Sequence, residues 1–219
     1  MKPLLSLIAI TALSGLLLAG NGYARGSQLF QQDRNLFQQT QQLNCDANVT
    51  STLPVYNLSY KQQSTIEFMY EEEKMARDVY LKMYEKYSIN IFKSIANSEQ
   101  KHMDSMKALL DKYSLSVAID ENNVGEFINT DLQKLYTQFV EQGSQSLEEA
   151  LKVGQTIENV DIADLVIAIS EANEDAKIVY NNLKFGSEKH LAAFTRLLDG
   201  SNQTSNQTYR GKAQSKGRR

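Results

Sequence analysis

Four long stretches of the chain carry apolar residues at intervals of three and four, the spacing that places them on one face of an α-helix. They predict helices at about 64–86, 89–112, 146–170 and 173–198. No proline and only four glycines occur between Val55 and Asp199, which favours long helices. A shorter helix is predicted at 131–142, within the long connection between the second and third helices. The pattern therefore predicts an all-α four-helix bundle with a crossover segment containing a short extra helix.

The apolar stripe of the first predicted helix is interrupted by an acidic residue. At about 100° per residue, Glu73 lies roughly 20° from Tyr80 around the helix, well inside the stripe. Glu72 lies about 100° and Glu71 about 160° away from Glu73. Of these three consecutive glutamates, we expect Glu73 to point inward.

The other three long helices also carry polar side chains on their apolar faces. Glu99 and His102 lie three residues apart on the second helix, and Glu158 and Asp161 repeat that spacing on the third, so each pair shares one side. Asp164 lies at the edge of the third stripe. On the fourth helix His190 faces inward. The candidate site residues are Glu73, Glu99, His102, Glu158, Asp161 and His190.

Four ionised carboxylates in one apolar core need compensation, because burying even one unpaired charge costs at least several kcal/mol. They must protonate, pair with cations or bind metal, and the inner faces carry no obvious Lys or Arg partner. Two divalent metal ions would balance the charge of four carboxylates, and two imidazoles would complete six ligands. Oxygen and imidazole ligands without thiolate suit iron, with manganese as the alternative. The ordinary alternative is a set of solvated or helix-edge side chains.

The composition narrows the chemistry. The chain has two histidines, both in this set, and one cysteine, Cys45, which excludes an internal disulfide or a CxxC site. Of 23 Lys and Arg residues, one lies at position 2 and five in the last ten residues. The other 17 basic residues and all 26 Asp and Glu residues lie between residues 25 and 200. This part of the chain therefore has a net charge of −9, which argues against nucleic-acid binding.

The ends of the chain differ from its centre. Lys2, an apolar run and small residues before Ala24 predict a signal peptide at 1–24, and hence an exported protein, periplasmic or secreted; an uncleaved anchor is the alternative. No later stretch is apolar enough to cross a membrane. A polar Gln/Asn-rich linker is expected at 25–58, the bundle at 59–199 and a disordered basic tail at 200–219.

Four segments resemble a ferritin-like family catalogued as domain of unknown function 2202, and more distantly rubrerythrin. They are Tyr70–Tyr80, Ile95–Met103, Gly154–Leu165 and Gly186–Phe194. The resemblance implies a ferritin-like bundle with a two-metal centre, for which iron is the expected metal. The glutamate of the rubrerythrin fourth-helix motif would fall at Ser187, and Asp161 is the candidate replacement. The rubredoxin module of rubrerythrin has no counterpart here.

These observations lead to three hypotheses. The first is an exported di-metal oxidoreductase of ferroxidase or peroxide/dioxygen-reducing type, acting on ferrous iron or a small oxidant, with a homo-oligomer as a further expectation. In it, Glu73 and Asp161 are terminal ligands, Glu99 and Glu158 bridge, and each histidine holds one metal. The second is a metal-binding or sequestration module without turnover. The third is a metal-free helical interaction bundle. Two inward glycines, Gly154 and Gly186, suggest either close helix packing or room for an oxidant.

Overall fold

The computed structural model describes the backbone of residues 53–214 and the side chains of residues 53–200. The predicted signal peptide, most of the predicted linker and Cys45 lie outside the described residues. Within the described part the chain is all-helical, with five helices and no strand. No helix there is long and apolar enough to span a membrane.

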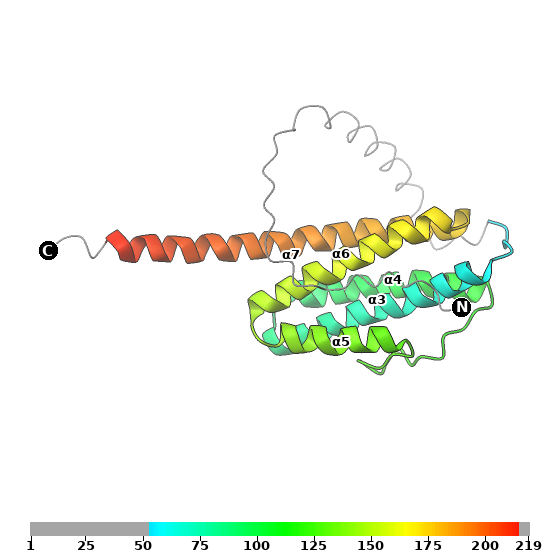
Figure 1. Cartoon of the computed structure of the whole chain (residues 1–219), viewed down its shortest axis with the longest axis horizontal. Helices are drawn as coiled ribbons and strands as arrows, with labels where there is room; N and C mark the ends of the chain where they lie inside the picture. The colour runs from blue at the N-terminus through cyan, green and yellow to red at the C-terminus, as the bar shows by residue number, and fades with distance from the viewer. Residues whose placement is uncertain (1–52, 215–219) are drawn as a thin grey trace, which may run out of the picture. The chain divides into compact units, whose positions relative to one another are not determined.

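The structure confirms the predicted helices within a few residues at most ends (Figure 1). They are α3 (Tyr60–Tyr87), α4 (Asn90–Lys112), α5 (Thr130–Gly143), α6 (Leu147–Glu171) and α7 (Glu174–Gln214). The largest difference is at the end of α7, which continues to Gln214 although its apolar pattern ends near Leu198. The sequence predicts a disordered tail from residue 200, whereas the backbone there is helical as far as Gln214.

Side chains at the helix starts explain where several helices begin. Ser59 and Gln62 form a capping box at α3, and Asn129 accepts hydrogen bonds from the first amides of α5. At the start of α6, Ser146 accepts a hydrogen bond from the amide of Glu149 at 3.1 Å. The carboxylate of Glu149 accepts a hydrogen bond from the side chain of Gln142 at 2.9 Å.

The long helices form a bundle in which α3 packs on α4 and α6 packs on α7. Contacts of α3 with α6 and of α4 with α7 close the bundle, while α5 lies against α3 and α6. The connections between α3 and α4 and between α6 and α7 are short, so the helices of each pair are antiparallel. Figure 1 shows α3 and α7 running in one direction and α4 and α6 in the other. The segment from α4 to α6, which includes α5, therefore crosses the length of the bundle.

The core consists of two apolar clusters with polar residues between them. One cluster includes Val79, Phe92 and Phe194, and the other includes Met106 and Leu183. On each of the four long helices, the predicted site residues lie in the interval of sequence between the two clusters. A buried polar layer therefore interrupts the hydrophobic core at one level.

The outer face of α3 holds the crossover segment at 113–129 through buried charges. The carboxylate of Asp78 accepts hydrogen bonds from Lys74 at 2.7 Å, from Arg77 at 2.8 Å and from the amide of Gly125 at 2.9 Å. Lys74 and Arg77 also donate to backbone carbonyls of the crossover. Helical periodicity places Glu71 away from the core. It is nevertheless buried, under the crossover segment, where it accepts hydrogen bonds from the amides of Ile128 and Asn129.

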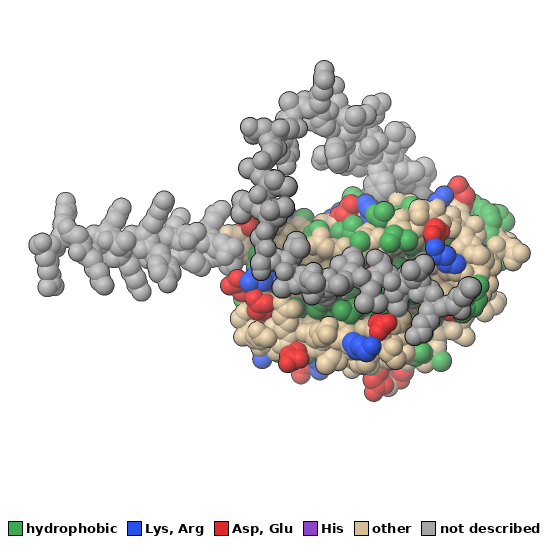
Figure 2. Space-filling view, viewed as in Figure 1, with side chains coloured by type: hydrophobic (Ala, Val, Ile, Leu, Met, Phe, Trp, Pro, Cys, Tyr) green, Lys and Arg blue, Asp and Glu red, His purple; other side chains and the backbone are tan. Residues whose placement is uncertain are grey.

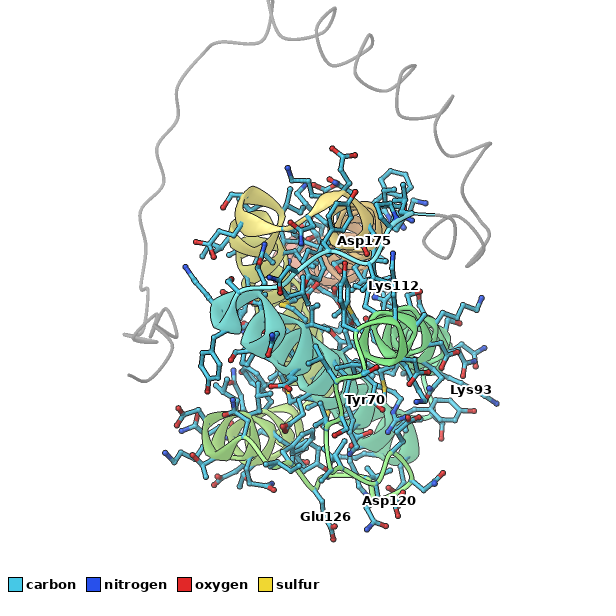
Figure 3. The ribbon with its side chains drawn as sticks, turned by 90° about the vertical axis from the view of Figure 1, so that its right-hand side faces the viewer. Tyr70, Lys93, Lys112, Asp120, Glu126 and Asp175 are labelled. Carbon is cyan, nitrogen blue, oxygen red and sulfur yellow. The ribbon has the colours of Figure 1, made fainter. Side chains whose placement is uncertain are left out.

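Further contacts tie the middle of the crossover and the end of α4 to the bundle (Figure 3). The hydroxyl of Tyr70 donates to Glu121, close to the labelled Asp120. At the start of α7, the buried Asp175 pairs with Lys112 at 2.7 Å and accepts from Tyr113 at 2.5 Å. The buried carboxylates of Asp78, Glu71 and Asp175 are thus matched to cations, hydroxyls or backbone amides.

Replacing Asp78 with Ala should lower the free energy of unfolding by about 3–5 kcal/mol, because it leaves the charges of Lys74 and Arg77 buried without their partner. Urea unfolding followed by circular dichroism measures the loss. Glu85→Ala is the control, because its ion pair with Lys82 is exposed and should contribute little. An effect of Asp78→Ala no larger than that of Glu85→Ala would contradict the structural role of the buried pair.

Candidate metal centre

The predicted site residues come from four helices and meet in the buried polar layer. Helix α3 supplies one, α4 and α6 supply two each, and α7 supplies one, and every one of them is at least nine-tenths buried. They are Glu73, Glu99, His102, Glu158, Asp161 and His190. On the part of the surface that Figure 2 shows, charged side chains are spread widely and no histidine is visible.

Five of the six form two groups that could each hold a metal ion. Glu73, Glu99 and His102 make one group, and Glu99, Glu158 and His190 make the other. Within each group, one ligand atom from each residue lies within 4.8 Å of the others. Glu99 belongs to both groups, so the two candidate positions share a carboxylate.

The two oxygens of Glu99 face different imidazoles. Its Oε2 lies 2.7 Å from Nδ1 of His102, and its Oε1 lies 2.9 Å from Nδ1 of His190. Glu73 adds an oxygen 3.2 Å from the first imidazole, and Glu158 adds one 3.5 Å from the second. The two rings are stacked, with centroids 5.6 Å apart. Each imidazole thus has two carboxylates beside the same nitrogen.

Asp161 lies beside this arrangement, outside both groups. It is buried, and neither of its oxygens has a hydrogen-bond partner among the described residues. Burial and the charges of Glu73 and Glu158 raise the pKa of Asp161, while the nearby hydroxyl of Ser187 lowers it. Ser187 is itself buried and donates to the carbonyl of Leu183 at 3.1 Å. Asp161, the candidate replacement for the missing carboxylate, therefore lies next to Ser187, the position where that carboxylate was expected.

In the metal-free protein, protonated imidazoles compensate part of the buried negative charge. Although burial opposes it, the two flanking glutamates raise the pKa of His102 well above its usual value and that of His190 to about 10. Burial alone would raise the pKa of Glu99, but the two histidines lower it to about 2. Burial raises the pKa of Glu73 to about 7 and that of Glu158 to about 8.

Tyr80 fixes the orientation of Glu158. Its side chain is fully buried, and its hydroxyl donates to Oε1 of Glu158 at 2.6 Å. This is the geometry expected of a core tyrosine with a bonded hydroxyl. Since the other oxygen of Glu158 faces His190, this carboxylate contacts only one of the two candidate positions.

The two inward glycines allow close packing. A Cβ at Gly186 would lie 2.5 Å from Nε2 of His102, and a Cβ at Gly154 would lie 2.6 Å from the ring of Phe194. The space beside each glycine is thus filled by a ring. Of the two readings of these glycines, the structure favours packing over a chamber for an oxidant, and Gly186 lets the imidazole of His102 lie against α7.

Helical periodicity missed one buried acidic residue next to the site. Glu72 is buried, and its Oε2 has no hydrogen-bond partner among the described residues. Burial, followed by the charges of Asp161, Asp164 and Glu73, raises the pKa of Glu72. The run of three consecutive glutamates could have indicated a larger buried acidic group, but their angular positions around the helix placed only Glu73 on the apolar face.

Fold and site together define a helical bundle with a buried carboxylate–imidazole centre. The chain belongs to the family described as "Uncharacterized protein domain (DUF2202)", which matches residues 62–216 and confirms the resemblance seen in the motifs. It is 48% identical over 157 residues to the uncharacterized protein MJ0754 of Methanocaldococcus jannaschii, covering 70% of this chain and 85% of the relative. The crystal structure of hypothetical protein MJ0754 from Methanococcus jannaschii is 45% identical, with a TM-score of 0.67 over 69% of this chain and 87% of that one. The similarity to rubrerythrin stays a prediction.

The pKa values predict how the stability of the metal-free protein depends on pH. Glu73, Glu158 and His190 all have raised pKa values in the folded state, so the folded protein holds more protons than the unfolded chain above about pH 6. The free energy of unfolding should therefore fall as the pH rises from about 6 to about 9. Urea unfolding in the presence of a chelator measures it.

The Glu73→Gln/Glu158→Gln double variant is the matched comparison, because it removes the two carboxyls that titrate within this range. Its stability should change less steeply with pH than that of the unmodified protein. A stability that rises from pH 6 to pH 9 in the unmodified protein would contradict the assignment.

Proposed function

We propose that this protein holds two divalent metal ions in its buried polar layer and acts as an oxidoreductase of ferroxidase or peroxide/dioxygen-reducing type. Iron is the proposed metal, with manganese as the alternative. The observation that carries the proposal is the pair of buried groups that share Glu99, each completed by one histidine and one further glutamate.

The donor set fits such ions. Each group offers carboxylate oxygen and imidazole nitrogen, the ligands that suit iron and manganese. One oxygen of Glu73 and both of Asp161 lack a hydrogen-bond partner among the described residues, and the oxygens of Glu99 face only imidazole nitrogens, which leaves buried acceptors for a cation. Bound metal would replace the protons that the imidazoles hold in the metal-free protein, so binding should release protons and strengthen as pH rises.

The geometry supports particular roles for the ligands. Glu99 is the proposed bridge, because each of its oxygens faces a different histidine. The sequence suggested Glu158 as a second bridge, but its contacts favour a ligand to one metal, held in place by Tyr80. Glu73 is the corresponding ligand on the other side. Asp161 is the proposed sixth ligand and takes the place of the carboxylate absent at Ser187.

The directions of the four long helices, with a crossover between α4 and α6, support a ferritin-like bundle and the more distant similarity to rubrerythrin. When bound, iron would supply the one-electron changes that such redox reactions need. The chain's own part is to orient the ligands through Tyr80 and Gly186 and to exclude water with the apolar clusters on both sides. Export to the periplasm or medium is also part of the proposal and is supported by the sequence of residues 1–24.

Metal analysis tests the site. Protein reconstituted anaerobically with ferrous iron should hold about two equivalents, and Glu99→Ala should lose most of both because Glu99 serves both positions. Asp161→Ala should lose part of the metal. Glu141→Ala, an exposed acidic residue on α5, is the control and should keep about two equivalents. Full metal content in Glu99→Ala would show that the ligand assignment is wrong.

Metal binding without turnover is the second candidate, and the serine at position 187 favours it because a terminal carboxylate is missing from α7. Stopped-flow mixing of the ferrous protein with peroxide or dioxygen separates the two. An oxidoreductase should be oxidised much faster than free ferrous iron in the same buffer. A rate no faster than that would leave metal binding as the function.

A further inference from the structure

A second set of acidic side chains lies beside the proposed ligands. Glu72 of α3 is buried, with 3% of its surface exposed, and Asp164 of α6 is only partly buried. Each of the two carboxyl groups shifts the pKa of the other, so they are close neighbours. Neither belongs to the two groups that could hold a metal, so the proposed function does not use them.

No cation compensates this set. Within 4 Å of Glu72, Asp161 and Asp164 there is no Lys or Arg among the described residues. The fold treats its other buried carboxylates differently, since Asp78 and Asp175 are paired with basic side chains. In addition, one oxygen of Glu72 and both oxygens of Asp161 are buried without a hydrogen-bond partner. These unpartnered oxygens indicate a place for a cation that comes from outside the chain.

The acidic residues run from one partly exposed position to two buried ones. Asp164 is partly exposed, Glu72 lies next to it and is buried, and Asp161 interacts with both Glu72 and Glu73. Asp161 and Asp164 are three residues apart on α6, so they lie one turn from each other on the same side. The set therefore leads from the surface of the protein to the centre of the bundle.

We propose that Asp164 and Glu72 form an uptake site that captures a divalent cation from solvent and passes it by way of Asp161 to the central ligands. This inference rests on the proposed function. Carboxylates concentrate cations at a partly exposed opening and raise the rate of capture. Because this pair lacks the imidazole and the third ligand of the central groups, it should hold the cation more weakly and release it inward.

The test measures the rate of metal loading separately from the final metal content. Full-length metal-free protein is mixed with Co²⁺ in a stopped-flow instrument, and the visible absorption of bound cobalt is followed. Glu72→Gln and Asp164→Asn keep the side-chain shapes but remove the charges. Glu141→Gln makes the same change in net charge at an exposed site on α5, and melting temperatures check that every variant is folded.

Glu72→Gln should load about tenfold more slowly than the unmodified protein and Asp164→Asn also more slowly, while both still reach about two equivalents. Glu141→Gln should stay within about twofold of the unmodified rate. Loading of both site variants at the unmodified rate would overturn the proposal, and the two carboxyls would then be a pair that shares a proton. Loss of an equivalent would also overturn it, because the residues would then be ligands. Failure of the unmodified protein to bind cobalt would instead refute the proposed function.

Discussion

The burial of several carboxylates in the middle of a helical bundle is the constraint on which this structure depends. The polar layer divides the hydrophobic core into two clusters, so the bundle gives up apolar packing at the level where a continuous core would otherwise form. In the metal-free protein the two imidazoles compensate the layer in part, through contacts of 2.7 and 2.9 Å with Glu99. Such a layer costs stability unless its charges are paired, protonated or bound to a cation, because unpaired buried charge is expensive.

The fold contains two kinds of buried carboxylate. Asp78, Asp175 and Glu71 are fully matched, by basic side chains or backbone amides, and they hold the crossover and the helix ends in place. The carboxylates facing the centre have imidazole as their only basic neighbour or, like Asp161, have no recorded hydrogen-bond partner among the described residues. This difference separates structural acids from those available to a cation. Helix α3 carries both kinds, one on its inner face and one on its outer face.

The helices and the inward residues could be predicted from the sequence because both follow from local geometry. A repeat of about 3.6 residues fixes which side chains share a face, so Glu73, Glu99 and His190 could be placed on apolar faces without knowledge of their neighbours. The burial of Glu71 could not be predicted in this way. It depends on the crossover segment, which covers the outer face of α3 and supplies two backbone amides from a distant part of the chain.

The sequence by itself determined the helices, the family and the six candidate ligands, because periodicity and motif are properties of nearby residues. Tertiary structure decided which of those ligands meet. In the folded protein Glu99 lies between the two histidines, and Asp161 lies beside them. One oxygen of Glu158 accepts a hydrogen bond from Tyr80, and the imidazole ring of His102 fills the space at Gly186. Those outcomes depend on the relative height and rotation of four helices, which packing between distant segments sets and no local pattern encodes.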